Sequence, residues 1–454
     1  MTRLLHEFKQ SGFLKLLVTL ALPIALQNMF TSTMTLVDLL MVGQLNEAAV
    51  ASVGIANQFV FIFIVIQYGI HSGIAVFTAQ YWGKKDLSRL KQLSGLGIGW
   101  GMLLAIPAAV MAVGFPEAVM GFFSKDPEVV AAGAAYLSTV GMVFPLATVV
   151  LSYVSNLRAM NVVKIPLYVT MLGVSLNITL NYLLIFGKMG LPALGVQGAA
   201  LGTCISKFVE AGILITIVHV KKYPLAATFR EMKALDKAFC RRVFTTCWPV
   251  FLNEFFWVTG VSMYNLVYAR MGTSSIAAVN IMASIEEVMY IPFFGIFHGG
   301  AIMIGNAIGA EEREQAYGIG KNLLISQVIM ALGAGLLIIL FRDFILSFYQ
   351  ISPEARANAH YLLMVSGLIF WVKSTNITNV VSVLRGGGDT KFGFFMDLTG
   401  VWCIGVPLAF IGAFVLHLPV YWVMALVSLE EIYKLVVGLP RFLSRKWISN
   451  LVQA

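Results

Sequence analysis

The chain has 454 residues, of which 59% are hydrophobic and 12% are charged, and its mean hydropathy is +0.84. Soluble domains carry about 25% charged residues, so this composition excludes a soluble protein and indicates an integral membrane protein. The formal net charge of +9 would suggest nucleic-acid binding in a soluble chain. Here the basic residues gather in the predicted loops of one side, so topology explains the charge and we expect no nucleic-acid partner.

Apolar stretches predict twelve transmembrane helices. From the N-terminus they cover about residues 16–43, 49–81, 93–114, 129–153, 166–186, 196–220, 243–270, 276–308, 318–341, 355–384, 392–416 and 419–440. We therefore expect an all-α integral membrane protein with two pseudo-symmetric six-helix bundles. The predicted division is an N-terminal lobe at 1–222, a cytoplasmic linker at 223–242 and a C-terminal lobe at 243–454.

The first apolar stretch, 16–43, is longer than the ~20 residues that a helix needs to cross a bilayer. It contains Asp38, and a carboxylate near the centre of a span costs roughly 2.5–3.5 kcal/mol. We therefore expect Asp38 to face protein or water. Pro23 removes a backbone hydrogen bond and bends the helix, so it is a candidate hinge. The alternative is a kinked helix with a packing role, in which Asp38 lies at the water-exposed outer end.

The two halves of the chain repeat each other. The offset that aligns Pro23 with Pro249 also aligns Gly69 with Gly295, Gly73 with Gly299, and Gly83 with Gly309. One residue out of step, Arg158 and Lys164 meet Arg385 and Lys391. Shared prolines and glycines are not expected from apolar composition alone, so we infer homologous halves with Pro249 as the second hinge. Repeated halves are typical of membrane transporters.

Alternate predicted loops collect most of the Lys and Arg residues. An even number of spans puts both termini on the same side of the membrane. By the positive-inside rule, we expect both termini and the central linker to be cytoplasmic.

Polar residues in the first half suggest an ion site. Besides Asp38 they include Asn156, Asn177, Asn181 and Thr203. Asn177 and Asn181 are four apart and share one helix face. Amide oxygens beside a carboxylate suit a hard cation or a proton, although hydrogen bonding between helices is an equally good interpretation of the asparagines. Lys207 and Glu210, three apart, are expected to pair with each other.

The second half is richer in charge. We assign Glu254, Lys373, Glu286 and Asp397 to a candidate substrate cavity. Glu254 lies about 16 Å into its helix, near mid-membrane, as does Lys373. Two interpretations stay open: a buried Glu254–Lys373 bridge, or a Glu254 that faces a cavity and attracts a cation. Glu430 and Lys434, four apart, are expected to form a structural pair.

Several motifs resemble those of the multidrug and toxic compound extrusion (MATE) family, of the bacterial kind related to NorM and DinF. The motifs are VDLLMVG at 37–43, SLNITLNYLLIFG at 175–187, GAALGT at 198–203, YARMGTSSIAAVNI at 268–281 and LRGGGDT at 384–390. The resemblance runs from about Leu16 to about Arg441. It implies two six-helix lobes in a V, and export of amphipathic, often cationic, drugs or metabolites in exchange for H⁺ or Na⁺.

The resemblance also assigns residues. Asp38, Asn177, Asn181 and Thr203 match the family's first-lobe cation site, and Asn156 matches it more weakly. In a sodium-coupled protein Asp38, Asn177 and Asn181 would be metal ligands. Glu254 resembles an acid of helix 7, and Pro23 the proline whose bend accompanies protonation. The resemblance further implies a monomer in the bacterial inner membrane, with the coupling ion in place of any cofactor.

The sequence departs from the family pattern in two places. Some members carry an aspartate where this chain has Asn181, and NorM-like members carry one in helix 10, where this chain has Lys373, Asn376 and Asn379. Asp38 and Glu254 are therefore the main candidates for ion coupling.

Other functions receive less support. A flippase for a lipid-linked sugar, from the same superfamily, would need a basic cavity, whereas the charges within the predicted spans are mostly acidic. An enzyme is not expected, because the chain contains no HExxH motif and no GxSxG in a strand–turn–helix context. A Walker-type phosphate-binding motif is also missing. The scattered cysteines, Cys204, Cys240, Cys247 and Cys403, predict neither a disulfide framework nor a zinc site.

Overall fold

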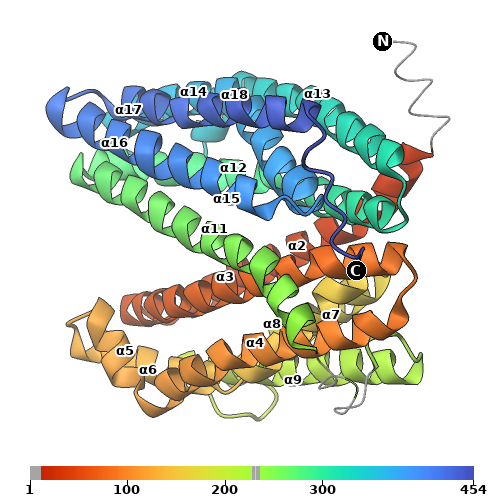
Figure 1. Ribbon diagram of the computed structural model, residues 1–454. Helices are drawn as coiled ribbons and strands as arrows, with labels where there is room; N and C mark the ends of the chain where they lie inside the picture. The colour runs from red at the N-terminus through yellow and green to blue at the C-terminus, as the bar shows by residue number, and fades with distance from the viewer. Residues whose placement is uncertain (1–11, 227–230, 232–235, 454) are drawn as a thin grey trace. The chain divides into compact units, whose positions relative to one another are not determined.

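The computed structural model describes residues 12–226, 231 and 236–453, and their regular structure is helical throughout (Figure 1). In the first half the helices are α2 (Phe13–Val42), α3 (Glu47–Gly83), α4 (Leu87–Gly114), α5 (Pro116–Phe123), α6 (Pro127–Gly141), α7 (Phe144–Ala159), α8 (Lys164–Phe186) and α9 (Val196–Val220). Part of the predicted linker, 227–230 and 232–235, lies outside the described residues.

The second half contains α-helices and three π-helical segments. In order they are α11 (Lys237–Arg270), α12 (Thr273–Gly309), α13 (Arg313–Leu346), α14 (Pro353–Ile377), η1 (Thr378–Arg385), α15 (Thr390–Leu398), η2 (Thr399–Gly405), α16 (Val406–Phe410), η3 (Ile411–Val415), α17 (Val420–Val427) and α18 (Leu429–Leu443).

Eight helical segments of the described chain are long and apolar enough to cross a membrane. The pair α6 and α7, bent by 50°, adds a ninth. The remaining three predicted spans coincide with α11, with α14 plus η1, and with α17 plus α18. The predicted all-helical membrane fold is thus confirmed.

The single helix predicted at 129–153 is interrupted in the structure. α6 ends at Gly141, and α7 begins at Phe144 with Pro145 in its first turn. Proline lacks the backbone N–H that a continuous helix would need, and it is tolerated in a first turn, so a new helix begins there.

Helix ends follow local sequence signals. Asn46 Oδ1 accepts a hydrogen bond from the Ala49 backbone N–H at 2.7 Å and caps α3. Ser352 caps α14 in the same way, directly before Pro353. α8 ends at Phe186 and is capped by Gly187, whose φ of 64° lies in the left-handed region that glycine adopts without strain.

The chain divides into two compact units. The N unit is Leu26–Cys247, and the C unit is Trp248–Ala454 together with the chain up to Ala25. Both boundaries fall inside continuous helices, α2 and α11, within two residues of Pro23 and Pro249. The start of α2 is therefore grouped with the second half of the sequence, and the start of α11 with the first.

Each unit has its own apolar core. In the N unit Phe63 stacks on Phe144 with ring centroids 4.2 Å apart. In the C unit Tyr290 packs on Phe370 with centroids 4.8 Å apart. Glycine permits close helix contact: a Cβ on Gly367 of α14 would lie 2.7 Å from a backbone oxygen of α13. Small residues serve this purpose in membrane helix packing.

Candidate functional site

A chain of hydrogen bonds in the N unit joins three helices. Asn181 Nδ2 on α8 donates to Asp38 Oδ1 on α2 at 2.7 Å and lies 3.3 Å from Asn177 Oδ1. Asn177 Nδ2 in turn donates to Thr203 Oγ1 on α9 at 3.2 Å. The structure therefore brings together four of the five residues predicted for the coupling site. We call this set, Asp38, Asn181, Asn177 and Thr203, the Asp38 chain.

Helix geometry explains the Asp38 chain. Asn177 and Asn181 are one turn apart on α8 and are fully buried, whereas Asp38 and Thr203 are partly exposed. Gly202 leaves room for the buried amide, because a Cβ at that position would overlap Asn181 Oδ1. Asn181 Oδ1 itself has no hydrogen-bond partner. The buried end of the chain thus holds an acceptor oxygen beside a partly exposed carboxylate.

The fifth predicted residue, Asn156, lies elsewhere. Its Oδ1 accepts a hydrogen bond from Thr78 Oγ1 at 2.5 Å, and its Nδ2 donates to the Ser152 carbonyl at 2.8 Å. Asn156 therefore connects α7 to α3 and does not take part in the hydrogen bonds of the Asp38 chain. Among residues 12–226, 231 and 236–453, no group of three or more His, Cys, Asp or Glu side chains is arranged to hold a metal ion.

A second polar chain in the N unit was missed by sequence reasoning. Arg158 Nη2 donates to Gln27 Oε1 at 2.5 Å, and Gln27 Nε2 donates to Thr170 Oγ1 at 2.8 Å. Thr170 donates to Glu210 at 3.3 Å, and Lys207 Nζ lies 2.7 Å from the other Glu210 oxygen. The predicted Lys207–Glu210 pair is confirmed. For the contacts of Arg158, Gln27 and Thr170, the sequence offers one signal, the repeat that matches Arg158 with Arg385.

In the C unit, Glu254 pairs with Arg385, not with Lys373. Arg385 Nη2 at the end of η1 lies 2.8 Å from Glu254 Oε1 on α11. The proposed Glu254–Lys373 bridge is therefore wrong. Both residues lie near mid-span, but similar depth does not place two side chains on facing helix surfaces.

Lys373 instead pairs with Glu286. Lys373 Nζ lies 2.7 Å from Glu286 Oε2, and Ser366 Oγ donates to Glu286 Oε1 at 2.5 Å. The ammonium also lies 5.9 Å from the centroid of the Tyr290 ring. α12 and α14 are thus joined by an ion pair in which both carboxylate oxygens have a partner.

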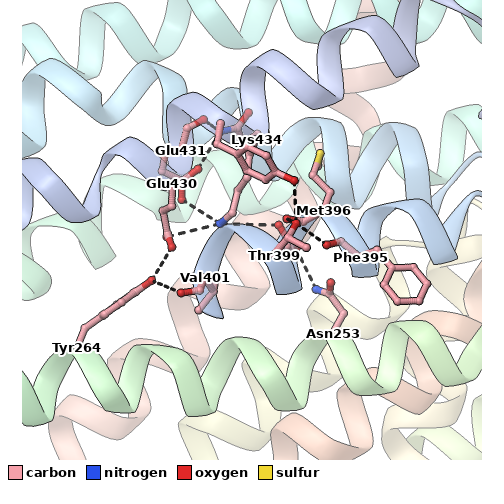
Figure 2. A network of polar contacts seen from close by, with 12 residues as sticks. Asn253, Tyr264, Phe395, Met396, Thr399, Val401, Glu430, Glu431 and Lys434 are labelled. Atoms are coloured by element: carbon pink, nitrogen blue, oxygen red, sulfur yellow. Dashed lines mark hydrogen bonds and ion pairs between the residues drawn. The ribbon is translucent and has the colours of Figure 1, made fainter. Parts of the chain in front are cut away.

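Asp397 belongs to a third group, centred on Lys434 of α18. Figure 2 shows Lys434 in this group with Glu430 and Glu431. Lys434 Nζ lies 3.4 Å from Glu431, 3.6 Å from Glu430 and 3.8 Å from Asp397. The predicted Glu430–Lys434 pair is therefore present as part of a larger cluster. We call Lys434, Asp397, Glu430 and Glu431 the Lys434 cluster. The four residues assigned to a substrate cavity accordingly fall into three separate ion-pair groups.

Repeated halves, membrane spans and buried ion-pairing groups together define a membrane transporter. The particular family follows from comparison with known proteins: the MatE family model matches residues 23–183 and 249–411. The chain belongs to the MatE family of transporters, as its motifs predicted. It is therefore a multi-pass membrane transporter and not an enzyme.

Relatives extend along nearly the whole chain. An uncharacterized transporter, YisQ of Bacillus subtilis, is 25% identical over 438 residues, which is 96% of this chain and 95% of that protein. A probable multidrug resistance protein, NorM of Thermotoga maritima, is 24% identical over 446 residues, with 96% and 94% covered.

Solved structures share the fold. A MOP superfamily transporter from Pyrococcus furiosus matches with a TM-score of 0.85 at 16% identity, over 95% of this chain and 96% of that one. A variant of the Vibrio cholerae MATE transporter VcmN matches with a TM-score of 0.86 at 18% identity, over 96% and 99%.

Proposed function

We propose that this chain is a secondary active antiporter of the bacterial inner membrane. It exports amphipathic, often cationic, drugs or toxic metabolites in exchange for H⁺ or Na⁺. The relatives named as probable multidrug resistance proteins support this proposal. The observation that carries it is the Asp38 chain, in which a carboxylate on α2 is hydrogen-bonded through α8 to α9.

Ion binding at Asp38 would change this chain at its first link. Asp38 is partly exposed, so an incoming ion meets the carboxylate before it meets the buried asparagines. A proton on Asp38 makes it a weaker hydrogen-bond acceptor for Asn181 Nδ2, because the carboxyl loses its charge. Sodium would instead use the oxygens of Asp38, Asn177 and Asn181, since hard cations bind oxygen ligands.

Coupling requires that the ion and the substrate bind preferentially to different conformations of the protein. A tenfold difference in substrate affinity between the two shapes corresponds to about 1.4 kcal/mol. Pro23 and Pro249 would act as hinges, because both unit boundaries fall beside them. Each proline leaves the carbonyl four residues earlier without its helical hydrogen bond, which makes bending easier there.

The substrate role of Glu254, Glu286, Lys373 and Asp397 stays a prediction. Each carboxylate among them lies within 4 Å of a cationic side chain. A cationic substrate would therefore bind by exchanging with Arg385, Lys373 or Lys434. Cytoplasmic termini and a monomeric state likewise belong to this proposal.

A lipid-linked sugar flippase is the alternative function. It needs basic side chains that are available for a pyrophosphate. Lys207, Lys373, Arg385 and Lys434 each have a carboxylate within 4 Å, which favours the antiporter.

Efflux of a fluorescent cationic dye from energised vesicles tests the proposal, with sodium and pH gradients imposed separately. We expect one gradient to drive efflux and thereby name the coupling ion. Dye movement that is independent of both gradients, together with binding of an anionic lipid substrate, would favour the flippase.

A further inference from the structure

The chain that follows α18 packs onto the C unit. We call residues 445–453 the strap; in Figure 1 it is the dark-blue coil that leads to the C label. Within the strap Trp447 is 0% exposed and Val452 is 2% exposed. The indole Nε1–H of Trp447 donates to the Phe442 carbonyl at 2.9 Å. Segments outside helices stay ordered where packing ties them down, so these buried side chains indicate a defined docking place.

The docking place includes the turn after η1, where the chain has three consecutive glycines. A Cβ on Gly387 would overlap the Trp447 ring, and one on Gly388 would lie 3.1 Å from the Leu451 side chain. Between these contacts the Ser449 backbone N–H donates to the Gly387 carbonyl at 2.9 Å. The turn and the strap therefore fit each other, because the glycines leave the space that Trp447 and Leu451 occupy.

Polar contacts link the two ends of the strap to α13 and α12. At its start Arg445 Nη1 donates to Glu314 Oε1 on α13 at 2.5 Å. Near its end Asn450 Nδ2 donates to the Ile308 carbonyl of α12 at 3.5 Å. Exposed ion pairs contribute little stability, and both side chains of the first pair are exposed. We therefore expect the buried Trp447, and not Arg445, to hold the strap in place.

The repeat provides a comparison for the glycine turn. The turn after α7 aligns with the turn after η1 when Arg158 is matched with Arg385. In both turns the third residue after the arginine has a positive φ, 64° at Asn161 and 87° at Gly388. In both, that residue donates its N–H to the arginine carbonyl, at 2.9 Å and 3.0 Å respectively. The two turns thus share one backbone conformation.

The two turns differ in what covers them. Met160 of the N unit aligns with Gly387 of the C unit, and Met160 is 1% exposed. The N unit therefore places a buried side chain of the turn itself at this position. The C unit has a glycine there, and its neighbour is Trp447 of the strap.

The glycine turn also determines where η1 ends. A π-helix is an uncommon conformation, so its ends depend on the contacts that surround them. The Gly387 N–H donates to the Val383 carbonyl at 2.8 Å, so a residue in contact with the strap continues the hydrogen bonds of η1. Arg385 is the last residue of η1, is 6% exposed, and lies 2.8 Å from Glu254. A shift of the turn would therefore move Arg385 away from Glu254.

We propose that the strap is a conformational device that positions the Arg385–Glu254 ion pair, with Trp447 as the positioning residue. Trp447 packs on the glycine turn, fixes the end of η1 and thereby sets the direction of the Arg385 side chain. This proposal does not rest on the antiport function, because it concerns the conformation of the C unit alone.

Hydrogen–deuterium exchange of the full chain in detergent, measured by mass spectrometry of its peptides, tests the proposal. We expect Trp447→Ala to speed exchange at least about tenfold in the strap and also in residues 378–389. Lys446→Ala is the matched control, because Lys446 is exposed and precedes Trp447 in the strap. It should exchange like wild type. Leu451→Ala keeps Trp447 and should give a smaller increase in the same peptides, so the test does not depend on the folding of Trp447→Ala.

Thermal unfolding separates positioning from simple packing. Trp447→Ala should lower the melting temperature more in the wild type than in a background that carries Glu254→Met and Arg385→Met, where no ion pair is left to position. Coupled residues give such non-additive effects, whereas independent ones give additive effects. Equal losses in the two backgrounds would show that Trp447 acts by packing alone and would overturn the proposal.

Two exchange patterns would also contradict it. Faster exchange confined to the strap, with residues 378–389 unchanged, would show that the glycine turn keeps its conformation without Trp447. Faster exchange throughout the N unit as well would indicate a general loss of stability in place of a local effect on η1.

Discussion

Arg385 and Glu254 form a buried ion pair, with 2.8 Å between Arg385 Nη2 and Glu254 Oε1. Arg158, which the repeat matches with Arg385, makes a related contact with Gln27, one position before the residue that aligns with Glu254. In each unit an arginine thus holds the helix that contains the hinge proline, four or five residues after that proline. The C unit uses a charged partner where the N unit uses an amide.

Removal of one partner of this pair should destabilise the protein strongly. Glu254→Gln leaves a buried guanidinium without its counter-charge, which costs about 3–5 kcal/mol. The double variant Glu254→Met with Arg385→Met removes both charges and should be close to wild type in stability. Thermal unfolding in detergent measures both. Equal losses in the single and double variants would contradict this account of the pair.

The Asp38 chain depends on the absence of a side chain at residue 202. Gly202→Ala should displace the Asn181 amide, break its hydrogen bond to Asp38 and reduce ion-driven efflux at least about tenfold, which is 1.4 kcal/mol of coupling. Gly212→Ala on the same helix is the matched control, because a Cβ there meets nothing within 4 Å. If both variants transport equally well, the packing of Asn181 is unimportant for coupling.

Hinge bending predicts a specific effect of proline replacement. Pro23→Ala or Pro249→Ala restores the helical hydrogen bond at a unit boundary, so we expect a higher melting temperature and slower efflux. Pro107→Ala, inside α4 and away from both boundaries, should raise stability without slowing efflux. Efflux rates that fall equally in all three variants would show that the boundary prolines have no special role.

The membrane topology can be checked directly. A fluorescent protein fused after Ala454 should fold and fluoresce in the cytoplasm, and alkaline phosphatase fused there should stay inactive. A fusion within the loop between α5 and α6, which contains Lys125, should give the reverse pattern. Active phosphatase at the C-terminus would contradict the positive-inside assignment.

Composition and spacing predict much of this structure. Apolar length is enough to locate the spans, and the one-turn spacing of Asn177 and Asn181 places both amides on the face of α8 that meets Asp38. Neighbours on one helix, such as Lys207 and Glu210, are also predictable, because a fixed 3.6-residue turn brings them together.

Partners on different helices are not predictable in the same way. Arg385 reaches Glu254 from η1, a π-helical segment whose wider turn rotates the side chains away from the positions that an α-helix would give them. A single sequence does not reveal that rotation. Nor does it show which of several mid-membrane acids lies opposite Lys373, because that depends on helix packing.

Simultaneous recording of dye efflux and ion entry in proteoliposomes tests the central claim most directly. The comparison is wild type against Asp38→Asn, with Asp343→Asn as the matched control, since the Asp343 side chain is 68% exposed at the end of α13. We predict that Asp38→Asn still binds the dye but loses gradient-driven efflux and ion entry together, while the control keeps both. Full ion-dependent export by Asp38→Asn would contradict the account.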